Sequence, residues 1–432
     1  MGLKLLIGGS PCTHWSIAQT KNRETEASGI GWELFLNYRI ARDKYKPDFF
    51  LYENNKSMSP AIREQITAEL GVEPVLINSA LVSAQNRQRL YWVGKRNPDG
   101  TYSQVPVEQP EDRGILLRDI LESGAVTWHE KAYTLRASAA TKQGVSNVLR
   151  HIETNGHFGY MGVAEPVAIK PLTEREMDYM VGVHGNYSDR WTYLQKPGEA
   201  DKALCITANV HRGVPYNICA EPVRIGTIEN DAKNPDHDSQ QYRVYSPDGK
   251  SVTLCGNGGG LGAKTGLYAT PVDGPDGKAW PVYEVRDGFI AIKGKRYPIK
   301  LRDGCYIIRK LTVTECKRLQ TVPDTYAFPV SDTQAYKMLG NGWTVDVIVH
   351  LLSHCEGLTE EPVEVLSMYD GMSCGHIALD KLGVDVSAYY ATEIDKYAIE
   401  TTQHNYPDTI QLGDAFQVRA EDWALPRKEE NL

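Results

Sequence analysis

The segment Val365-Leu-Ser-Met-Tyr-Asp-Gly-Met-Ser-Cys-Gly-His-Ile-Ala-Leu379 joins an apolar run, a glycine-containing turn and a helical pattern. Where a strand of an open α/β sheet passes into a helix in this way, backbone N–H groups at the helix N-terminus face a ligand. The next apolar run, residues 387–392, ends at Glu393, where a carboxylate can accept hydrogen bonds from both hydroxyls of a ribose. The segment therefore predicts an α/β fold with a nucleotide-type binding corner.

The ligand predicted at this corner is an adenosine without a pyrophosphate. The turn lacks the G-x-G-x-x-G pattern that binds the pyrophosphate of a dinucleotide. Further along the chain, Gly413-Asp414 supplies a carboxylate suited to the edge of an adenine. S-adenosylmethionine is the common ligand of this kind. Residues 258–265 resemble a phosphate-binding loop, but Ala263 separates the last glycine from Lys264, so we interpret them as a flexible loop.

Alternating strand and helix patterns occupy both outer thirds of the chain. The first third has predicted strands at Lys4–Ile7, Asp48–Glu53, Val75–Ile77 and Arg89–Gly94, and predicted helices at Gly31–Tyr45 and Pro60–Leu70. The last third has predicted helices at Thr312–Leu319, Val345–Leu352 and His376–Leu382, with Gly357 as a cap of the second, and predicted strands at Val363–Met368 and Ser387–Thr392. This alternation predicts two parts of one doubly wound, mostly parallel sheet.

The middle of the chain, residues 99–305, has a different character. It is rich in Gly, Pro, Tyr, Asn and Thr and carries a weak internal repeat at Lys131–Ala137, Lys202–Ala208 and Lys250–Gly256. Such short strands with glycine-bearing loops suit a β-rich module that presents loops to a partner. We therefore expect an inserted domain at 99–305 between a catalytic part at 1–98 and the remainder of the same domain at 306–432.

The composition describes an ordinary soluble protein with a net charge of −8. No apolar run reaches the length of a membrane span, and no signal-peptide cleavage pattern follows the N-terminus. The eight cysteines form no C-x-x-C pair, which predicts a reducing cytoplasm, no disulfide framework and no zinc site. Basic residues concentrate at 293–318 and at 87–96. These two clusters are interpreted either as nucleic-acid contacts or as solvated charged faces.

Four side chains near predicted strand ends have the chemistry of a catalytic site. Cys12 follows an apolar strand and a Gly-Gly-Ser-Pro turn, so its thiol is placed either as a nucleophile or as a buried core cysteine. Glu53 ends a strand, where its carboxyl group can donate a proton to a ring nitrogen. Arg87 and Arg89 alternate, so at strand spacing they point the same way and can fix a carboxylate, a carbonyl oxygen or a phosphate.

Six segments together resemble a known enzyme family. They are Gly8–Ser16 with its Pro-Cys pair, Glu53-Asn54, Gln85-x-Arg87-x-Arg89, Arg309–Gln320, Gly340–Val347 and Tyr369–Met372. In this combination they resemble the nucleophile loop, the catalytic strands, the helix that supports the recognition domain and the cofactor pocket of the C5-cytosine DNA methyltransferases. The resemblance implies a class I S-adenosylmethionine-dependent methyltransferase fold in the outer thirds and a target-recognition domain in the middle.

The order of these segments differs from the usual order of the family. The family begins with the cofactor strand and places the cysteine loop after it, whereas here the cysteine half comes first. This order resembles the circularly permuted members. Two residues also depart from the common pattern, since Ser10 stands where most members have a proline and Asn55 where they have a valine.

The resemblance implies a role for each candidate residue. Cys12 would add to carbon 6 of a cytosine that has left the DNA stack. Glu53 would contact ring nitrogen 3 and the exocyclic amine, Arg89 would hold the ring carbonyl oxygen and orient Glu53, and Arg87 would assist through Glu53 or a flanking phosphate. S-adenosylmethionine would be bound by Tyr369, Asp370, Gly371, Met372, Glu393, Ile394 and Asp414, with Pro11, Asn341 and Trp343 closing the pocket.

The implied activity is methylation of double-stranded DNA at carbon 5 of cytosine by a cytoplasmic monomer that needs no metal and binds no membrane. Two alternatives stay open. One is a catalytically silent paralogue that binds DNA or regulates a partner, and the other is the same chemistry on RNA or a free nucleotide.

Overall fold

The chain divides into two compact units. In this computed structural model the described residues are 2–11, 14–16, 23–122, 125, 127, 130–132, 134, 163–167, 224–227, 243–245, 267–268, 272–273, 279–280, 282–292, 295–299, 301–309 and 311–426. Unit 1 comprises residues 1–122, 129–142 and 311–432. Unit 2 comprises residues 123–128 and 143–310. The first unit thus combines the two ends of the chain.

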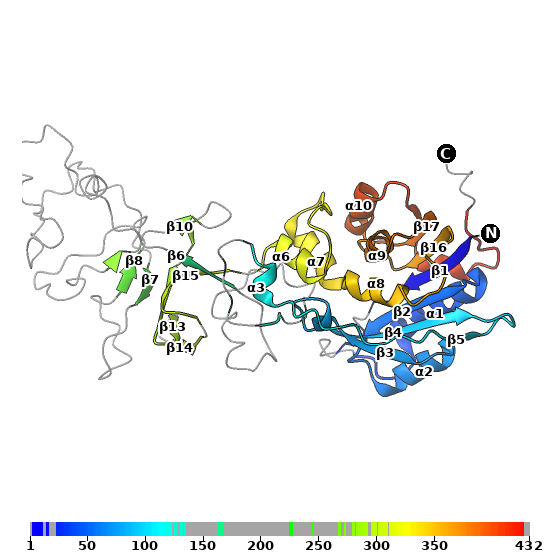
Figure 1. The fold of residues 1–432 in the computed structure, drawn as a ribbon, viewed down its shortest axis with the longest axis horizontal. Helices are drawn as coiled ribbons and strands as arrows, with labels where there is room; N and C mark the ends of the chain where they lie inside the picture. Colours follow the sequence, from blue (N-terminus) through cyan, green and yellow to red (C-terminus); the bar gives the residue numbers. More distant parts are fainter. Residues whose placement is uncertain are drawn as a thin grey trace, which may run out of the picture. The chain divides into compact units, whose positions relative to one another are not determined.

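Unit 1 is built around an eight-stranded mixed sheet (Figure 1). Its strand order is β18-β17-β16-β1-β2-β4-β3, with β5 paired to β4. The strands are β1 (Leu3–Gly8), β2 (Phe49–Asn55), β3 (Pro74–Asn78), β4 (Gln88–Arg96), β5 (Tyr102–Gln104), β16 (Val363–Met368), β17 (Val386–Thr392) and β18 (Ile410–Gly413). All pairs from β18 to β2 are parallel, whereas β4 is antiparallel to each of its neighbours. The prediction of a mostly parallel α/β sheet is confirmed.

The strand at the N-terminus lies between strands from the two ends of the chain. β1 pairs with β16 in the register Leu5↔Val365 and with β2 in the register Gly8↔Tyr52. Because the three strands are parallel, their carboxyl ends meet at one edge of the sheet, where open α/β sheets bind ligands. This edge therefore brings together the residues that follow Gly8, Tyr52 and Met368.

Helices cover both faces of the sheet. On one face, Leu6 and Tyr52 belong to a buried cluster with Phe35 of α1 and Ile62 of α2. On the other face α9 packs closely, since a Cβ added at Gly375 would lie 2.2 Å from Cδ1 of Ile7. The helices are α1 (Gly29–Tyr45), α2 (Pro60–Leu70), α3 (Leu117–Ile120), α6 (Val313–Leu319), α7 (Asp332–Asn341), α8 (Val345–Leu352), α9 (Cys374–Leu382) and α10 (Lys396–Asn405), with 3-10 turns at Ser79–Leu81 and Ala415–Arg419.

Local signals explain why some predicted boundaries match and others do not. α2 begins at Pro60 after the Ser59 side chain accepts the Ile62 N–H, and it ends at Gly71 in a left-handed conformation. The C-cap of α8 is Ser353, so the prediction of Gly357 as its cap is wrong. Gly357 instead has a φ of +84° in the turn that follows. Helices α7 and α10 were not predicted.

The described strands of unit 2 form a five-stranded antiparallel sheet in the order β14-β13-β12-β15-β6, a three-stranded sheet in the order β7-β8-β9 and the pair β10-β11. The larger sheet has a small core that includes Val285, Ile290 and Tyr306. The strands are β6 (Val163–Val167), β7 (Arg224–Thr227), β8 (Arg243–Tyr245), β9 (Leu267–Tyr268), β10 (Val272–Asp273), β11 (Ala279–Trp280), β12 (Val282–Arg286), β13 (Phe289–Ile292), β14 (Lys295–Pro298) and β15 (Gly304–Arg309). Most of the predicted repeat lies outside the described residues.

Several described members of the two basic clusters have partners close by. Lys317 is buried, and its Nζ donates to the backbone oxygens of Asp324 at 2.6 Å and Tyr326 at 3.1 Å. Arg318 donates to both oxygens of the Asp324 carboxylate, from Nε to Oδ1 at 3.2 Å and from Nη2 to Oδ2 at 2.6 Å. Arg87 is also buried, and Lys95 pairs with Glu356. These side chains stabilise local structure, so the count of basic residues overstates the positive surface.

The described residues can be searched for membrane spans, metal-binding groups and disulfides. Within the described residues, no helix has the length and apolarity needed to cross a bilayer. In that same part of the chain, no group of three or more His, Cys, Asp or Glu side chains is arranged to hold a metal ion. Cys305, Cys355 and Cys374 are cysteines outside any disulfide.

Candidate active site

The segment that leads to Cys12 is tied to the end of β2. Ser10 is buried, and its Oγ lies 2.6 Å from the Tyr52 hydroxyl. The Asn54 side-chain amide donates to the Ser10 carbonyl at 3.2 Å. Pro11 follows as an exposed residue, and Cys12 lies outside the described residues. The serine that replaces the family's usual proline thus makes a buried polar contact between the two strand ends.

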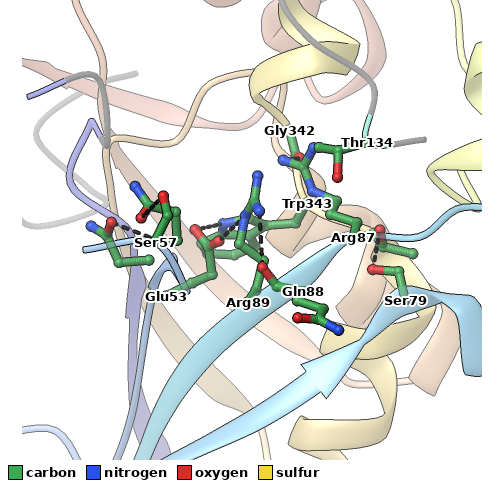
Figure 2. Close-up of polar contacts among 12 residues, drawn as sticks. Glu53, Ser57, Ser79, Arg87, Gln88, Arg89, Thr134, Gly342 and Trp343 are labelled. Atoms are coloured by element: carbon green, nitrogen blue, oxygen red, sulfur yellow. Dashed lines mark hydrogen bonds and ion pairs between the residues drawn. The ribbon is translucent and has the colours of Figure 1, made fainter. Parts of the chain in front are cut away.

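Glu53 is held through both oxygens of its carboxylate (Figure 2). Arg89 Nε lies 3.0 Å from Oε1, and the Trp343 indole nitrogen donates to Oε2 at 3.0 Å. The side chain of Glu53 is 12% exposed and that of Arg89 is 15% exposed. A charge-assisted hydrogen bond in such partly dehydrated surroundings is stronger than one at the surface. The carboxylate therefore has a defined orientation.

Arg87 and Arg89 reach different partners. The Arg87 guanidinium donates to the carbonyl oxygen of Gly342 at 2.9 Å and to that of Gly340 at 3.3 and 3.4 Å. It is only 3% exposed, whereas Arg89 faces Glu53 (Figure 2). Arg87 therefore supports the backbone beside Trp343. Asn55, the second departure from the family pattern, is buried and accepts the Ser57 hydroxyl at 3.0 Å.

A buried glutamine that the sequence analysis missed holds the same backbone. Gln320 is 1% exposed, and its Nε2 donates to the Leu339 carbonyl at 2.6 Å and to the Gly342 carbonyl at 3.3 Å. Its Oε1 accepts the Thr344 hydroxyl at 2.9 Å and the Gln85 amide at 3.3 Å. Gln320 lies in one of the six segments that carry the family resemblance, but no local pattern identifies its partners.

The glycine turn after β16 has an unusual backbone. Tyr369, Gly371 and Ser373 have φ values of +61°, +59° and +55°. Two of these residues carry side chains in a region that favours glycine, so the turn is strained and must be stabilised by its surroundings. The Tyr369 hydroxyl donates to the Leu34 carbonyl at 2.8 Å. The Tyr369 side chain is therefore committed to α1, and a ligand at the turn would meet its backbone.

Asp370 is enclosed beneath the turn. Its Oδ1 accepts the Tyr389 hydroxyl at 2.8 Å, and its Oδ2 accepts the Ser373 hydroxyl. Burial raises the pKa of Asp370 from its ordinary 3.8 to about 6, although these hydroxyl groups oppose the rise. Met372 is buried, and its carbonyl accepts the Tyr326 hydroxyl at 2.7 Å.

The Glu393 carboxylate connects the end of β17 to the glycine turn through hydrogen bonds. Its Oε2 accepts the Gly371 N–H at 2.8 Å, and its Oε1 accepts the N–H groups of Ile394 at 2.7 Å and Asp395 at 2.8 Å. Ile394 is 75% exposed, which is unusual for a large apolar side chain. Asp414 is exposed, and its Oδ1 accepts the Phe416 N–H at 2.9 Å. Asn341 is exposed at the end of α7.

A family model describes much of this chain. The model for the C-5 cytosine-specific DNA methylases matches residues 2–202 and 288–357. These residues include Glu53, Arg87, Arg89 and Trp343. More than half of the chain is therefore matched, and the matched part contains the polar constellation around Glu53.

Named methyltransferases are similar to this chain at low identity. The orphan methyltransferase M.SPRI of Bacillus phage SPR is 24% identical over 403 residues, covering 80% of this chain and 80% of that protein. The orphan methyltransferase M.Rho11sI of Bacillus phage rho11s is 26% identical over 290 residues, covering 59% of this chain and 54% of that protein. The type II methyltransferase M.HhaI of Haemophilus parahaemolyticus is 30% identical over 112 residues, covering 26% and 24%. With the family match, these similarities lead to one conclusion: the chain belongs to the C-5 cytosine-specific DNA methylase family.

Proposed function

We propose that this protein transfers a methyl group from S-adenosylmethionine to carbon 5 of cytosine in double-stranded DNA. The observation that carries the proposal is the Glu53 carboxylate, bound by Arg89 and Trp343 next to the strand end that leads to Cys12. A carboxylate fixed in this way matches a flat ring with adjacent nitrogen groups. The family to which the chain belongs supports the choice of cytosine and of DNA.

The proposed reaction uses Cys12 as the nucleophile. Its thiolate forms a bond to carbon 6 of the ring, which makes carbon 5 electron-rich enough to take up a methyl group. Glu53 stabilises the ring through nitrogen 3 and the exocyclic amine, and Arg89 holds the ring carbonyl oxygen. Loss of the carbon 5 proton to a base then breaks the bond to Cys12 and restores the aromatic ring. The target base must leave the duplex stack to reach these groups.

The described residues at the glycine turn fit S-adenosylmethionine. When bound, this cofactor would supply the methyl group. Glu393 would face the ribose hydroxyls, because each oxygen of its carboxylate can accept more hydrogen bonds than the backbone uses. The exposed side chain of Ile394 would pack on the adenine, and Asp414 would accept the adenine amine. A Cβ added at Gly371 would meet nothing within 4 Å, so the turn has room for a ligand.

We further propose that the chain is a circularly permuted member of the family. The pairing of β1 with β16 supports this, because the last third of the chain supplies the strands that precede the cysteine strand in the usual order. The family match also ends at residue 357, before β16 begins.

The middle of the chain is proposed as the target-recognition domain. The mainly antiparallel sheets that the described strands of unit 2 form support a role in presenting loops to duplex DNA. A reader of this size also favours duplex DNA over a free nucleotide as the substrate. Residues 99–305 would therefore determine which DNA sequence is methylated.

The experiment is a radiolabelled methyl-transfer assay on duplex DNA of mixed sequence, with RNA and free cytidine nucleotides as competing substrates. We expect label in DNA, and we expect Glu53→Gln to lower kcat at least about 100-fold because the ring loses its charged partner. Glu64→Gln on the exposed face of α2 is the matched control. DNA binding without label in any substrate, or faster labelling of RNA, would contradict the proposal.

A further inference from the structure

Trp343 stands on a connection of only three residues between two helices. α7 ends at Asn341 and α8 begins at Val345. The Gly342 amide donates to the Met338 carbonyl at 2.7 Å, and the Val345 amide donates to the Gln320 carbonyl at 2.9 Å. A side chain on so short a connection is positioned by both helices.

The backbone of this connection is also bound from the side. Arg87 and Gln320 both donate to the Gly342 carbonyl, and both side chains are almost fully buried. The Thr344 hydroxyl donates to Gln320 and accepts the Ser79 hydroxyl at 2.8 Å. Because these polar groups satisfy one another, the network holds the connection in one conformation.

The opposite side of the connection packs against the start of α9, directly after the glycine turn. A Cβ added at Gly342 would lie 3.1 Å from the Cys374 sulfur and 3.6 Å from the Met372 sulfur. Burial raises the pKa of the Cys374 thiol to about 12, and a hydrogen bond from the Trp343 backbone opposes that rise. Trp343 therefore contacts the glycine-turn side through its backbone and Glu53 through its indole nitrogen.

We infer that Trp343 is a positioning residue, whose indole N–H orients the Glu53 carboxylate for the cytosine. Through its backbone, Trp343 also couples that orientation to the glycine turn. Arg89 Nε lies against Oε1, whereas Oε2 accepts the Trp343 N–H, so the two donors together restrict rotation of the carboxylate about its Cγ–Cδ bond. This inference rests on the proposed function and adds to the pocket-closing role that the family resemblance implies for Trp343.

The test is Trp343→Phe, which removes the N–H donor and keeps an aromatic ring. We expect kcat for methyl transfer to fall about 10- to 100-fold, with the KM for S-adenosylmethionine changed less than about twofold. Trp92→Phe is the matched control, because its indole N–H donates to Thr67 at 3.0 Å on the opposite face of β4. That control also loses an indole N–H hydrogen bond, here to a hydroxyl group, and is expected to keep its kcat within about twofold.

A double-mutant cycle separates positioning from general structural damage. The rate of covalent capture on 5-fluorocytosine DNA is measured for Trp343→Phe alone and in a Glu53→Gln background. Only folded enzyme forms this adduct, so rates are normalised to the final amount captured. We expect the effect of Trp343→Phe to fall to less than about twofold once Glu53 is altered, because both changes act through one group.

Two results would overturn the inference while leaving the proposed function intact. One is a kcat of Trp343→Phe equal to that of the unaltered protein. The other is an effect of Trp343→Phe on the capture rate that is as large in the Glu53→Gln background as without it. An absence of methyl transfer by the unaltered protein would instead remove the proposed function itself.

Discussion

Gly9 and Glu53 lie so close that a Cβ added at Gly9 would be 2.8 Å from the Glu53 carbonyl oxygen and 3.0 Å from Oε2 of its carboxylate. Real Cβ atoms essentially never come within 3.0 Å of another heavy atom outside their neighbours. Glycine at position 9 therefore allows the segment that leads to Cys12 to lie directly against the Glu53 carboxylate.

Gly9→Ala is expected to lower kcat for methyl transfer about 10- to 100-fold, because the added methyl group displaces Glu53 from its partners. Methyl transfer per folded enzyme is the measurement. Gly8→Ala is the matched control, since its Cβ would lie 2.8 Å from the Met368 carbonyl, within the sheet and away from the carboxylate. Both variants should lose stability, and equal losses of kcat in the two would contradict the explanation.

Gln320→Leu is expected to lower the free energy of unfolding by about 2–4 kcal/mol, because a side chain of similar volume leaves the Leu339 carbonyl and the Thr344 hydroxyl without their partner. Urea unfolding followed by tryptophan fluorescence measures it. The exposed Gln88, which accepts Lys56 Nζ at 2.6 Å, gives the control Gln88→Leu. A loss of less than about 0.5 kcal/mol in both variants would show that the network is unimportant.

Glu393→Gln is expected to raise the KM for S-adenosylmethionine about 10- to 100-fold, with a smaller effect on kcat. The carboxylate accepts hydrogen bonds from three backbone N–H groups, and these bonds use both of its oxygens. A glutamine side chain has only one acceptor oxygen, because an NH₂ group takes the place of the other. Calorimetric titration with the cofactor provides an independent measurement. Glu400→Gln, at an exposed position of α10, should bind the cofactor normally. Normal binding by Glu393→Gln would remove this residue from the proposed site.

The raised pKa of Asp370 makes the free energy of unfolding depend on pH. Its pKa is raised by burial to about 6, so the folded state binds this proton more tightly than the unfolded state, where the ordinary value is 3.8. The resulting stability is fully present below about pH 4 and is lost as the pH rises through about 6. The stability of Asp370→Asn relative to the unaltered protein should therefore increase by about 2–3 kcal/mol between pH 4 and pH 7. Parallel stability curves over this range would contradict the assignment.

Much of the sheet is predictable from local patterns. The apolar run Val363–Met368 is a strand with those bounds, and Pro60–Leu70 is a helix with those bounds because Ser59, Pro60 and Gly71 mark its ends. The direction of β4 was not predicted. Only nine residues, 79–87, connect β3 to β4, which is too short for a parallel crossover and accounts for the antiparallel pairing.

The candidate site is predictable only in part, because its contacts join distant segments. The alternation of Arg87 and Arg89 indicated a common partner, but Arg87 precedes β4 and binds carbonyl groups more than 250 residues away along the chain. Trp343 was assigned to the cofactor pocket alone, since nothing in its neighbourhood reveals the hydrogen bond to Glu53. Long-range packing decides such partners, and sequence spacing does not encode them.

In the proposed reaction Cys12 attacks carbon 6 of cytosine. The most direct measurement incubates the protein with S-adenosylmethionine and duplex DNA that contains 5-fluorocytosine, then identifies the captured peptide by mass spectrometry. Fluorine cannot leave carbon 5 as a proton does, so the covalent complex should accumulate with the DNA attached to Cys12. Cys12→Ala should form no complex. Methylation of ordinary DNA by Cys12→Ala, or capture through another residue, would contradict this mechanism.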